Sequence, residues 1–246
     1  MLQPQSKGNE ILDALTGSIL KGELDLLPIQ VAGIKREISK IDNVAFKMHL
    51  SGILALLQGK DVHEAMELCE KAISLDTSES LYWSNYIVVL RNLGYLKKHN
   101  EFVKDSFYLI EYFPKRVSYE LLSLGMLSLD FEIIQKTMQF LDKVDIKMED
   151  IGIDGSKGGT IMLMCENTEQ VTKLTPMVSH LFDVLNEQYN GQIAFLLRTD
   201  DGTMGYIFKV KLSLSDVERL NDELFDRLYD NDLLHDDCFV HIEAKE

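Results

Sequence analysis

From about residue 9 to residue 143, apolar residues recur every three or four positions, which is the spacing of helices that bury one face. The pattern itself also repeats. A helix, a short break and a second helix begin at Ala45, and a shift of 34 residues gives the same order again, twice. The breaks fall at residues 59–61, near residue 94 and at residues 128–130. Such a period predicts helical hairpins that stack and bury their apolar faces on one another.

Equivalent positions of the three copies support this register. The corresponding residues are His49, Trp83 and Val117, and likewise Leu56, Leu90 and Leu124. In the second helix of the first copy, Ala65 and Ala72 stand seven residues apart, and small side chains there let two helices approach closely. Towards the amino terminus, Leu15 and Val31 fall at equivalent places, so residues 9–40 are predicted to form a further hairpin.

These features resemble the tetratricopeptide repeat family over residues 45–143, most closely in "DVHEAMELCEKAISLD" at residues 61–76. The resemblance implies a solenoid whose first helices line a concave groove for peptides or other proteins. Lys47, Asn85, Arg91 and Asn92 are the residues expected to face that groove. Leu50 and Leu54 occupy the places where carboxylate-binding members of the family carry Lys and Asn, so the resemblance does not predict capture of a free carboxylate.

After residue 143 the pattern changes to short strands that alternate with helices. The predicted strands are Thr160–Glu166, Gln192–Thr199, Met204–Leu212 and Cys238–Ala244, and the predicted helices are Thr168–Tyr189 and Ser213–Asp230. Asp200–Gly202 is a hairpin signal, and Ser215 with Glu218 is predicted to cap the second helix. The order βαββαβ is typical of a ferredoxin-like domain. The predicted fold class is therefore a helical repeat followed by an α+β domain.

The glycine-rich stretch "DGSKGGT" at residues 154–160 lies between these two parts. A phosphate-binding loop follows a strand, carries its Lys directly after the last glycine and opens into a helix, and this stretch instead precedes a predicted strand. Glycine and serine between two folded parts indicate a flexible linker. The expected organisation is a helical-repeat domain at residues 1–150, a linker at 151–160 and an α+β ferredoxin-like domain at 161–246.

The net charge is -15, and over half of it lies in residues 213–246, which hold eleven acidic and three basic residues. Asp222, Asp226 and Asp230 are four residues apart, so they share one face of the predicted helix. One interpretation is a solvated face that keeps the protein soluble. The alternative is a docking surface for a basic protein. An acidic chain repels phosphate backbones, so nucleic acid is not an expected partner.

Few residues of this sequence favour catalysis or cofactor binding. Cys69, Cys165 and Cys238 form no CxxC pair, and their placement predicts inert thiols in a reducing compartment. No HExxH or GxSxG motif occurs, and no cofactor is predicted. Tyr206 and Phe208 loosely match an RNA-recognition strand, but core or interface positions are expected for both. The polar amino terminus and the lack of a long apolar run predict a cytoplasmic protein without a membrane segment.

Three functional hypotheses follow. The first is a non-enzymatic protein-binding adaptor or regulator that uses the repeat groove and the acidic carboxy-terminal domain. The second is an inhibitor of the immunity or antitoxin sort that neutralises a basic, nuclease-like protein. The third is a small-ligand sensor or enzyme in the α+β domain, which a polar pocket with convergent Asp, His or Lys side chains would favour. Association of identical chains through the sheet or the repeat ends is left open.

Overall fold

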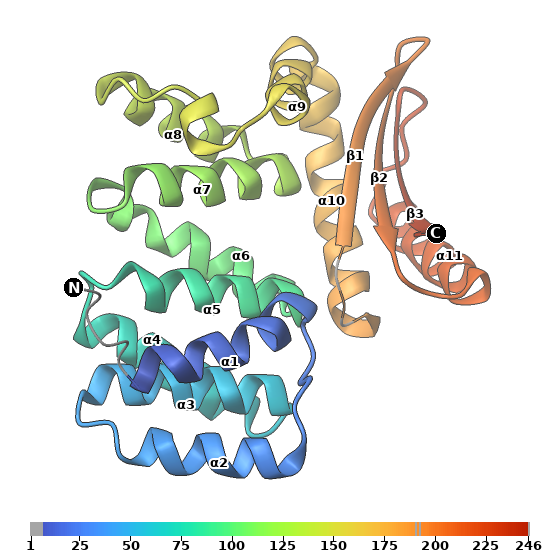
Figure 1. The fold of residues 1–246 in the computed structure, drawn as a ribbon. Coiled ribbons are helices and arrows are strands. Elements are labelled where there is room, and N and C mark those ends of the chain that lie inside the picture. The colour runs from blue at the N-terminus through green and yellow to red at the C-terminus, as the bar shows by residue number, and fades with distance from the viewer. Residues whose placement is uncertain (1–6, 190, 192, 246) are drawn as a thin grey trace. The chain divides into compact units, whose positions relative to one another are not determined.

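The computed structural model describes residues 7–189, 191 and 193–245 (Figure 1). The chain divides into two compact units, Met1–Tyr95 and Leu96–Glu246. This division falls about fifty residues before the domain boundary expected from the glycine-rich stretch, because three helices of the repeat pattern pack into the unit that contains the sheet.

The first unit consists of helices. They are α1 (Lys7–Lys21), α2 (Pro28–Ser39), α3 (Val44–Gln58), α4 (Val62–Leu75) and α5 (Ser80–Asn92). The predicted break after α3 is confirmed, and Gly59 ends that helix with a left-handed φ of 63°. A Cβ atom on Gly52 would lie 2.7 Å from the Ala65 carbonyl oxygen, so α3 and α4 approach closely at this glycine. Ala65 and Ala72 are fully buried, as expected of small residues at a close helix contact.

Helix α1 packs against both α3 and α5 in this unit (Figure 1). Near its start, Gly8 faces the ring of Phe46 at the beginning of α3. Near its end, the Asn92 side-chain amide donates hydrogen bonds to the carbonyl oxygens of Ile19 at 2.9 Å and Leu20 at 3.3 Å. Because the last carbonyls of a helix have no partner within it, Asn92 caps α1 from the end of α5.

The second unit begins with helices and ends with a sheet. Its elements are α6 (Leu96–Asp105), the 3₁₀ helix η1 (Ser106–Glu111), α7 (Pro114–Ser128), α8 (Phe131–Lys143), the 3₁₀ helix η2 (Glu149–Ile151), α9 (Gly155–Glu166), α10 (Thr168–Gln188), β1 (Ile193–Asp200), β2 (Thr203–Val210), α11 (Leu214–Asp230) and β3 (Cys238–Ala244). The predicted breaks near residue 94 and at residues 128–130 are confirmed. Helices α4, α6 and α8 begin 34 and 35 residues apart, which matches the period seen in the sequence.

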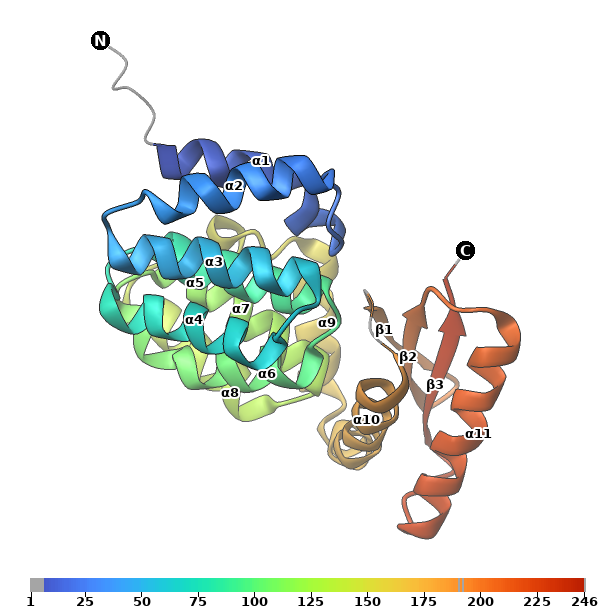
Figure 2. The same cartoon turned by 90° about the horizontal axis from the view of Figure 1, so that it is seen from below.

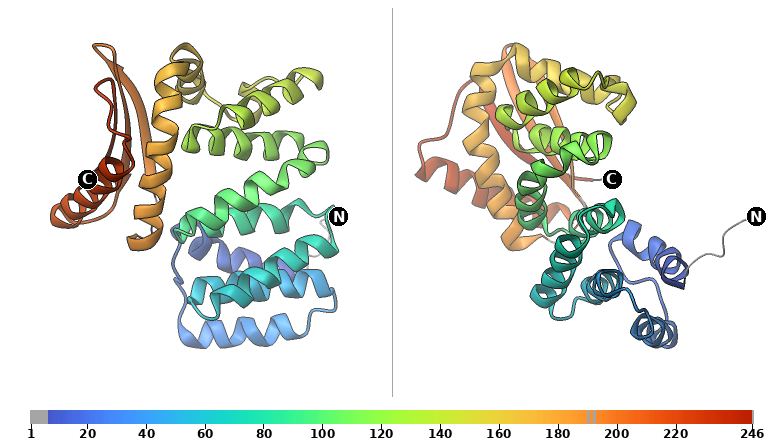
Figure 3. Two further views of the ribbon diagram at one scale, coloured as in Figure 1. Left: turned by 180° about the vertical axis from the view of Figure 1, so that it is seen from behind. Right: turned by 90° about the vertical axis from the view of Figure 1, so that its left-hand side faces the viewer.

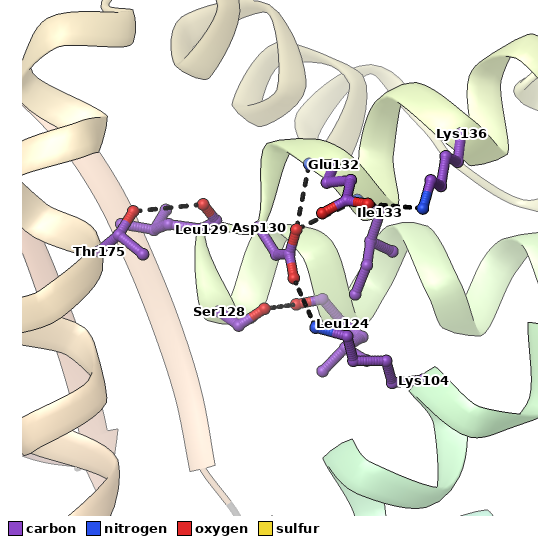
Figure 4. A network of polar contacts seen from close by, with 9 residues as sticks. All are labelled: Lys104, Leu124, Ser128, Leu129, Asp130, Glu132, Ile133, Lys136 and Thr175. Atoms are coloured by element: carbon purple, nitrogen blue, oxygen red, sulfur yellow. Dashed lines mark hydrogen bonds and ion pairs between the residues drawn. The ribbon is translucent and has the colours of Figure 1, made fainter.

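The turn between α7 and α8 ties several elements of this unit together (Figure 4). Asp130 caps α8 by accepting from the Glu132 and Ile133 amides, and its other oxygen accepts from Lys104 of α6 at 3.3 Å. Thr175 of α10 donates to the Leu129 carbonyl at 3.4 Å. Helices α7 and α8 share an apolar core with the carboxy-terminal elements, and α6 joins them through Lys104 and through its contacts with α7 and α10.

The glycine-rich stretch forms a helix, so both the predicted linker and the predicted strand at Thr160–Glu166 are wrong. Asp154 accepts hydrogen bonds from the amides of Ser156 and Lys157 at 3.1 Å each and caps α9. Ile161 and Met164, three residues apart, are buried in the core of the unit. A short apolar run does not distinguish a strand from a buried helix, and here packing overrides the low helix propensity of glycine.

The sheet has three strands among the described residues, in the order β1-β2-β3, so the four-stranded ferredoxin-like order is not found. Strand β2 pairs antiparallel with β1 and parallel with β3, and α11 forms the crossover between β2 and β3. The strands expected at residues 192–199, 204–212 and 238–244 are confirmed, apart from Gln192, which lies outside the described residues. Without a strand from residues 160–166, β3 pairs directly with β2.

Helices α10 and α11 lie on the same face of this sheet (Figures 2 and 3). That face carries Tyr206 and Phe208, which are fully buried, and Phe182 of α10 meets the Phe208 ring edge-on at a centroid distance of 5.3 Å. The Tyr206 hydroxyl donates to the Leu127 carbonyl of α7 at 2.6 Å. The expectation that both aromatic residues belong to the core is confirmed.

Candidate protein-binding surfaces

The inner side of α11 is fixed to the sheet and to α10 by apolar packing. Val217, Leu220, Leu224 and Leu228 are its buried residues. Asn221 accepts from the Ile242 amide at 2.9 Å and donates to the Ile242 carbonyl at 2.8 Å, so it satisfies the backbone of β3 at the sheet edge. The helix starts at Ser213, which accepts from the Asp216 amide, and not at the predicted cap Ser215.

An exposed aromatic pair lies on the outer side of α11. Phe225 and Tyr229 are 55% and 67% exposed, and their rings stack at a centroid distance of 6.4 Å and an interplanar angle of 20°. Their spacing of four residues places them one above the other on a helix. The other apolar side chains of α11 are buried, apart from Leu214, so the two rings are the main apolar feature of its outer side and a candidate binding surface.

Carboxylates flank this aromatic pair. Asp222, Asp226 and Asp230 are all exposed on α11, as the sequence predicts, and at 100° per residue they form a row beside Phe225 and Tyr229. No ion pair or hydrogen bond to these three carboxylates is found in the described part of the chain. The outer face of α11, defined here as these five residues, is therefore aromatic along one side and acidic along the other.

The basic residues of α11 do not neutralise that row, because they are bound to α10. Arg227 contacts Glu187 at 2.5 Å and Glu223 at 2.5 Å, and Arg219 donates to Gln188. The hydrogen bond to Arg227 lowers the pKa of Glu187, and the same contact raises the pKa of Arg227. The positive charge of Arg227 is thus satisfied beside α10 and leaves the outer face with uncompensated negative charge.

The four residues expected to line the repeat groove lie on two helices of the first unit. Lys47 lies on α3, and Asn85, Arg91 and Asn92 lie on α5. Asn92 caps α1, and the Asn85 amide approaches Nε2 of His49 at 3.4 Å. The Asn85 and Asn92 side chains therefore bind within the unit, and α1 packs along the two helices that were expected to form the groove.

His49 is a buried polar residue beneath this contact. Burial lowers its pKa to about 3, so it is neutral at physiological pH. Its Nδ1 and the Nε1 of Trp83 have no hydrogen-bond partner in the described structure. Its ring packs against Tyr82 at a centroid distance of 4.9 Å, which makes His49 a core residue.

Two of the three cysteines are buried. Burial raises the pKa of Cys69 and raises that of Cys238 to about 11, so both thiols stay protonated at neutral pH. Cys165 is exposed, on α9. In the described ranges, no three His, Cys, Asp or Glu side chains lie together as metal ligands. None of the described helices combines the length and the apolar character needed to cross a bilayer.

Phe225 and Tyr229 are the residues that sequence reasoning missed. Aromatic residues in an amphipathic helix usually belong to its buried face, so the sequence pattern predicted only the row of aspartates as a surface feature. A helical projection would have shown Tyr229 opposite Leu220 and next to Asp222, with Phe225 beside it. Comparison of the chain with protein-family models, with curated proteins and with solved structures gives no match.

Proposed function

We propose that the protein is a non-enzymatic adaptor or regulator that binds a basic protein on the outer face of α11. The observation that carries this proposal is the exposed, stacked pair Phe225 and Tyr229 beside three unpaired aspartates. Aromatic side chains supply much of the binding energy at protein interfaces, and complementary charge supplies orientation and rate. A partner that carries Lys or Arg beside an apolar residue matches both parts of this surface.

The helical hairpins of residues 44–143 support the same class of function through their resemblance to tetratricopeptide repeats. Arrays of this kind present extended surfaces to other proteins. Inhibition of a basic, nuclease-like protein is a second candidate, favoured by the uncompensated acidic row on α11. It differs from the first only in what binding does to the partner.

Two variants separate the aromatic from the acidic contribution. Phe225→Ser with Tyr229→Ser removes the rings, and neutralising Asp222, Asp226 and Asp230 to Asn removes the charge. Tyr108 and Tyr112, which are 59% and 66% exposed, provide the aromatic control when both are changed to Ser. Glu101→Gln with Asp105→Asn is the acidic control on the exposed side of α6. All four variants change exposed side chains, so unfolding free energies should stay within about 0.5 kcal/mol of the parent protein.

The test is affinity capture of the tagged full chain from its native lysate with nuclease added, at about 50 and about 300 mM salt, followed by affinity measurement with the purified partner. One basic protein should be retained at low salt. The serine variant should weaken its binding by about 2 kcal/mol or more, roughly 30-fold, and the asparagine variant should remove the salt dependence. The proposal fails if both variants bind the captured protein as tightly as the controls do. If the captured partner is a nuclease and loses its activity on binding, the result would favour the inhibitor function over the adaptor function.

A further inference from the structure

A pocket of about 330 Å³ opens between α2, α3 and α4 in the first unit. Its floor is apolar and includes Leu54 of α3 and Leu68 of α4. Lys35 from α2 and Lys60 from the turn after α3 line it as cations, and Asp61 and Glu64 line it as anions. This size lies at the lower end of the range for small-molecule sites, which are mostly apolar with a few placed polar groups.

The four charged groups of this pocket have no charged partner within the described chain. Lys35, Lys60, Asp61 and Glu64 are exposed, and no hydrogen bond or ion pair of their side chains is found among the described residues. Asp61 also occupies the position before α4 where its carboxylate would cap the helix, yet it accepts no hydrogen bond from the first turn. Two ammonium groups and two carboxylates therefore remain available around one apolar floor.

We propose that this pocket binds a small zwitterion with apolar side chains, of the size of a dipeptide. The carboxylate of such a ligand pairs with Lys35 and Lys60, its ammonium group pairs with Asp61 and Glu64, and its side chains cover Leu54 and Leu68. A ligand with one charge would satisfy only half of the groups, and a ligand without apolar side chains would leave the floor in water. The residues involved lie between positions 35 and 68, so the inference is independent of the α11 surface.

The experiment is calorimetric titration of the full chain with leucyl-leucine and with three analogues. Acetylation removes the ammonium charge, amidation removes the carboxylate charge, and glycyl-glycine keeps both charges without the apolar side chains. Leucyl-leucine should bind most tightly. Each capped analogue should bind about fivefold more weakly, because one exposed charge pair contributes up to about 1 kcal/mol.

Substitutions in the pocket test whether Lys35 and Lys60 pair with the carboxylate of the ligand. Changing Lys35 and Lys60 to Gln should weaken leucyl-leucine about fivefold or more and leave the affinity of its amide unchanged, since the amide has no carboxylate to pair. Ala55→Phe, at a half-buried position of the lining, should abolish binding of both, and circular dichroism checks that this variant is folded. Lys71→Gln, on the exposed side of α4 outside the pocket, is the matched control.

Three results would overturn the proposal. The first is no heat of binding for leucyl-leucine at concentrations up to roughly 10 mM, where even weak small-molecule binding is measurable. The second is equal affinity for the zwitterion and both capped analogues. The third is an equal effect of the lysine substitutions on leucyl-leucine and on its amide. Any of these outcomes would mean that the charges around the pocket do not recognise a ligand.

Discussion

Two glycines in helices should respond in opposite ways to the same substitution. Gly159 lies within α9, and a Cβ atom there would have no other atom within 4 Å. Gly52 lies within α3, where a Cβ atom would stand 2.6 Å from the Cys69 sulfur and 2.7 Å from the Ala65 carbonyl oxygen. Replacing glycine by alanine in the interior of a helix stabilises the folded state by about 1 kcal/mol, because alanine restricts the conformational freedom of the unfolded chain.

The net effect follows from these distances. Gly159→Ala should stabilise α9 by about 0.5–1 kcal/mol, with no steric cost. Gly52→Ala carries the same gain, but overpacking costs typically 1–3 kcal/mol. The upper value applies because the Ala65 oxygen belongs to the backbone of α4 and cannot turn aside as a side chain can. We therefore expect a net loss of about 2 kcal/mol.

Separate probes report on the two sites. Trp83 is the single tryptophan of the chain and is buried in α5, so its fluorescence during urea unfolding measures the stability of the first unit. Hydrogen exchange of the α9 amides measures the second site, where protection should rise about twofold to fivefold. A neutral Gly52→Ala, or a Gly159→Ala that lowers protection, would refute the reasoning from packing distances.

Three further predictions concern polar side chains that bond or pack within the fold. Tyr206→Phe removes the hydroxyl that donates to the Leu127 carbonyl, and urea unfolding followed by circular dichroism should show a loss of about 1–3 kcal/mol. Asn92→Ala removes the cap of α1, so amide exchange should rise first in the last turn of that helix, at a cost of about 1–2 kcal/mol. Burial lowers the pKa of His49 to about 3. Below about pH 6.5, His49 is therefore protonated in the unfolded chain but still neutral in the folded chain. Stability is therefore complete above that pH and falls with acidification, by about 2 kcal/mol at pH 5, and His49→Gln should remove this part of the pH dependence of Trp83 unfolding.

The sequence by itself determined the local elements. The period of three to four residues located the helices between residues 9 and 143, and the turn residues located their breaks at residues 59–61, 94 and 128–130. The three strands and α11 followed from alternation, the Asp-Gly turn and amphipathic spacing. These features depend on residues close together in the chain, so local propensity and periodicity were enough to predict them.

Only the tertiary structure decided the features that depend on distant residues. Residues 155–166 form a helix because Ile161 and Met164 pack into the apolar core of the second unit. No pattern within that segment predicts which distant residues they contact. The same applies to the end of α1, where the carbonyls of Ile19 and Leu20 accept hydrogen bonds from Asn92, 73 and 72 residues further along the chain. Phe225 and Tyr229 remain in solvent because Leu220, Leu224 and Leu228 already fill the space against the sheet, so the candidate binding surface emerged only once the packing of α11 was known.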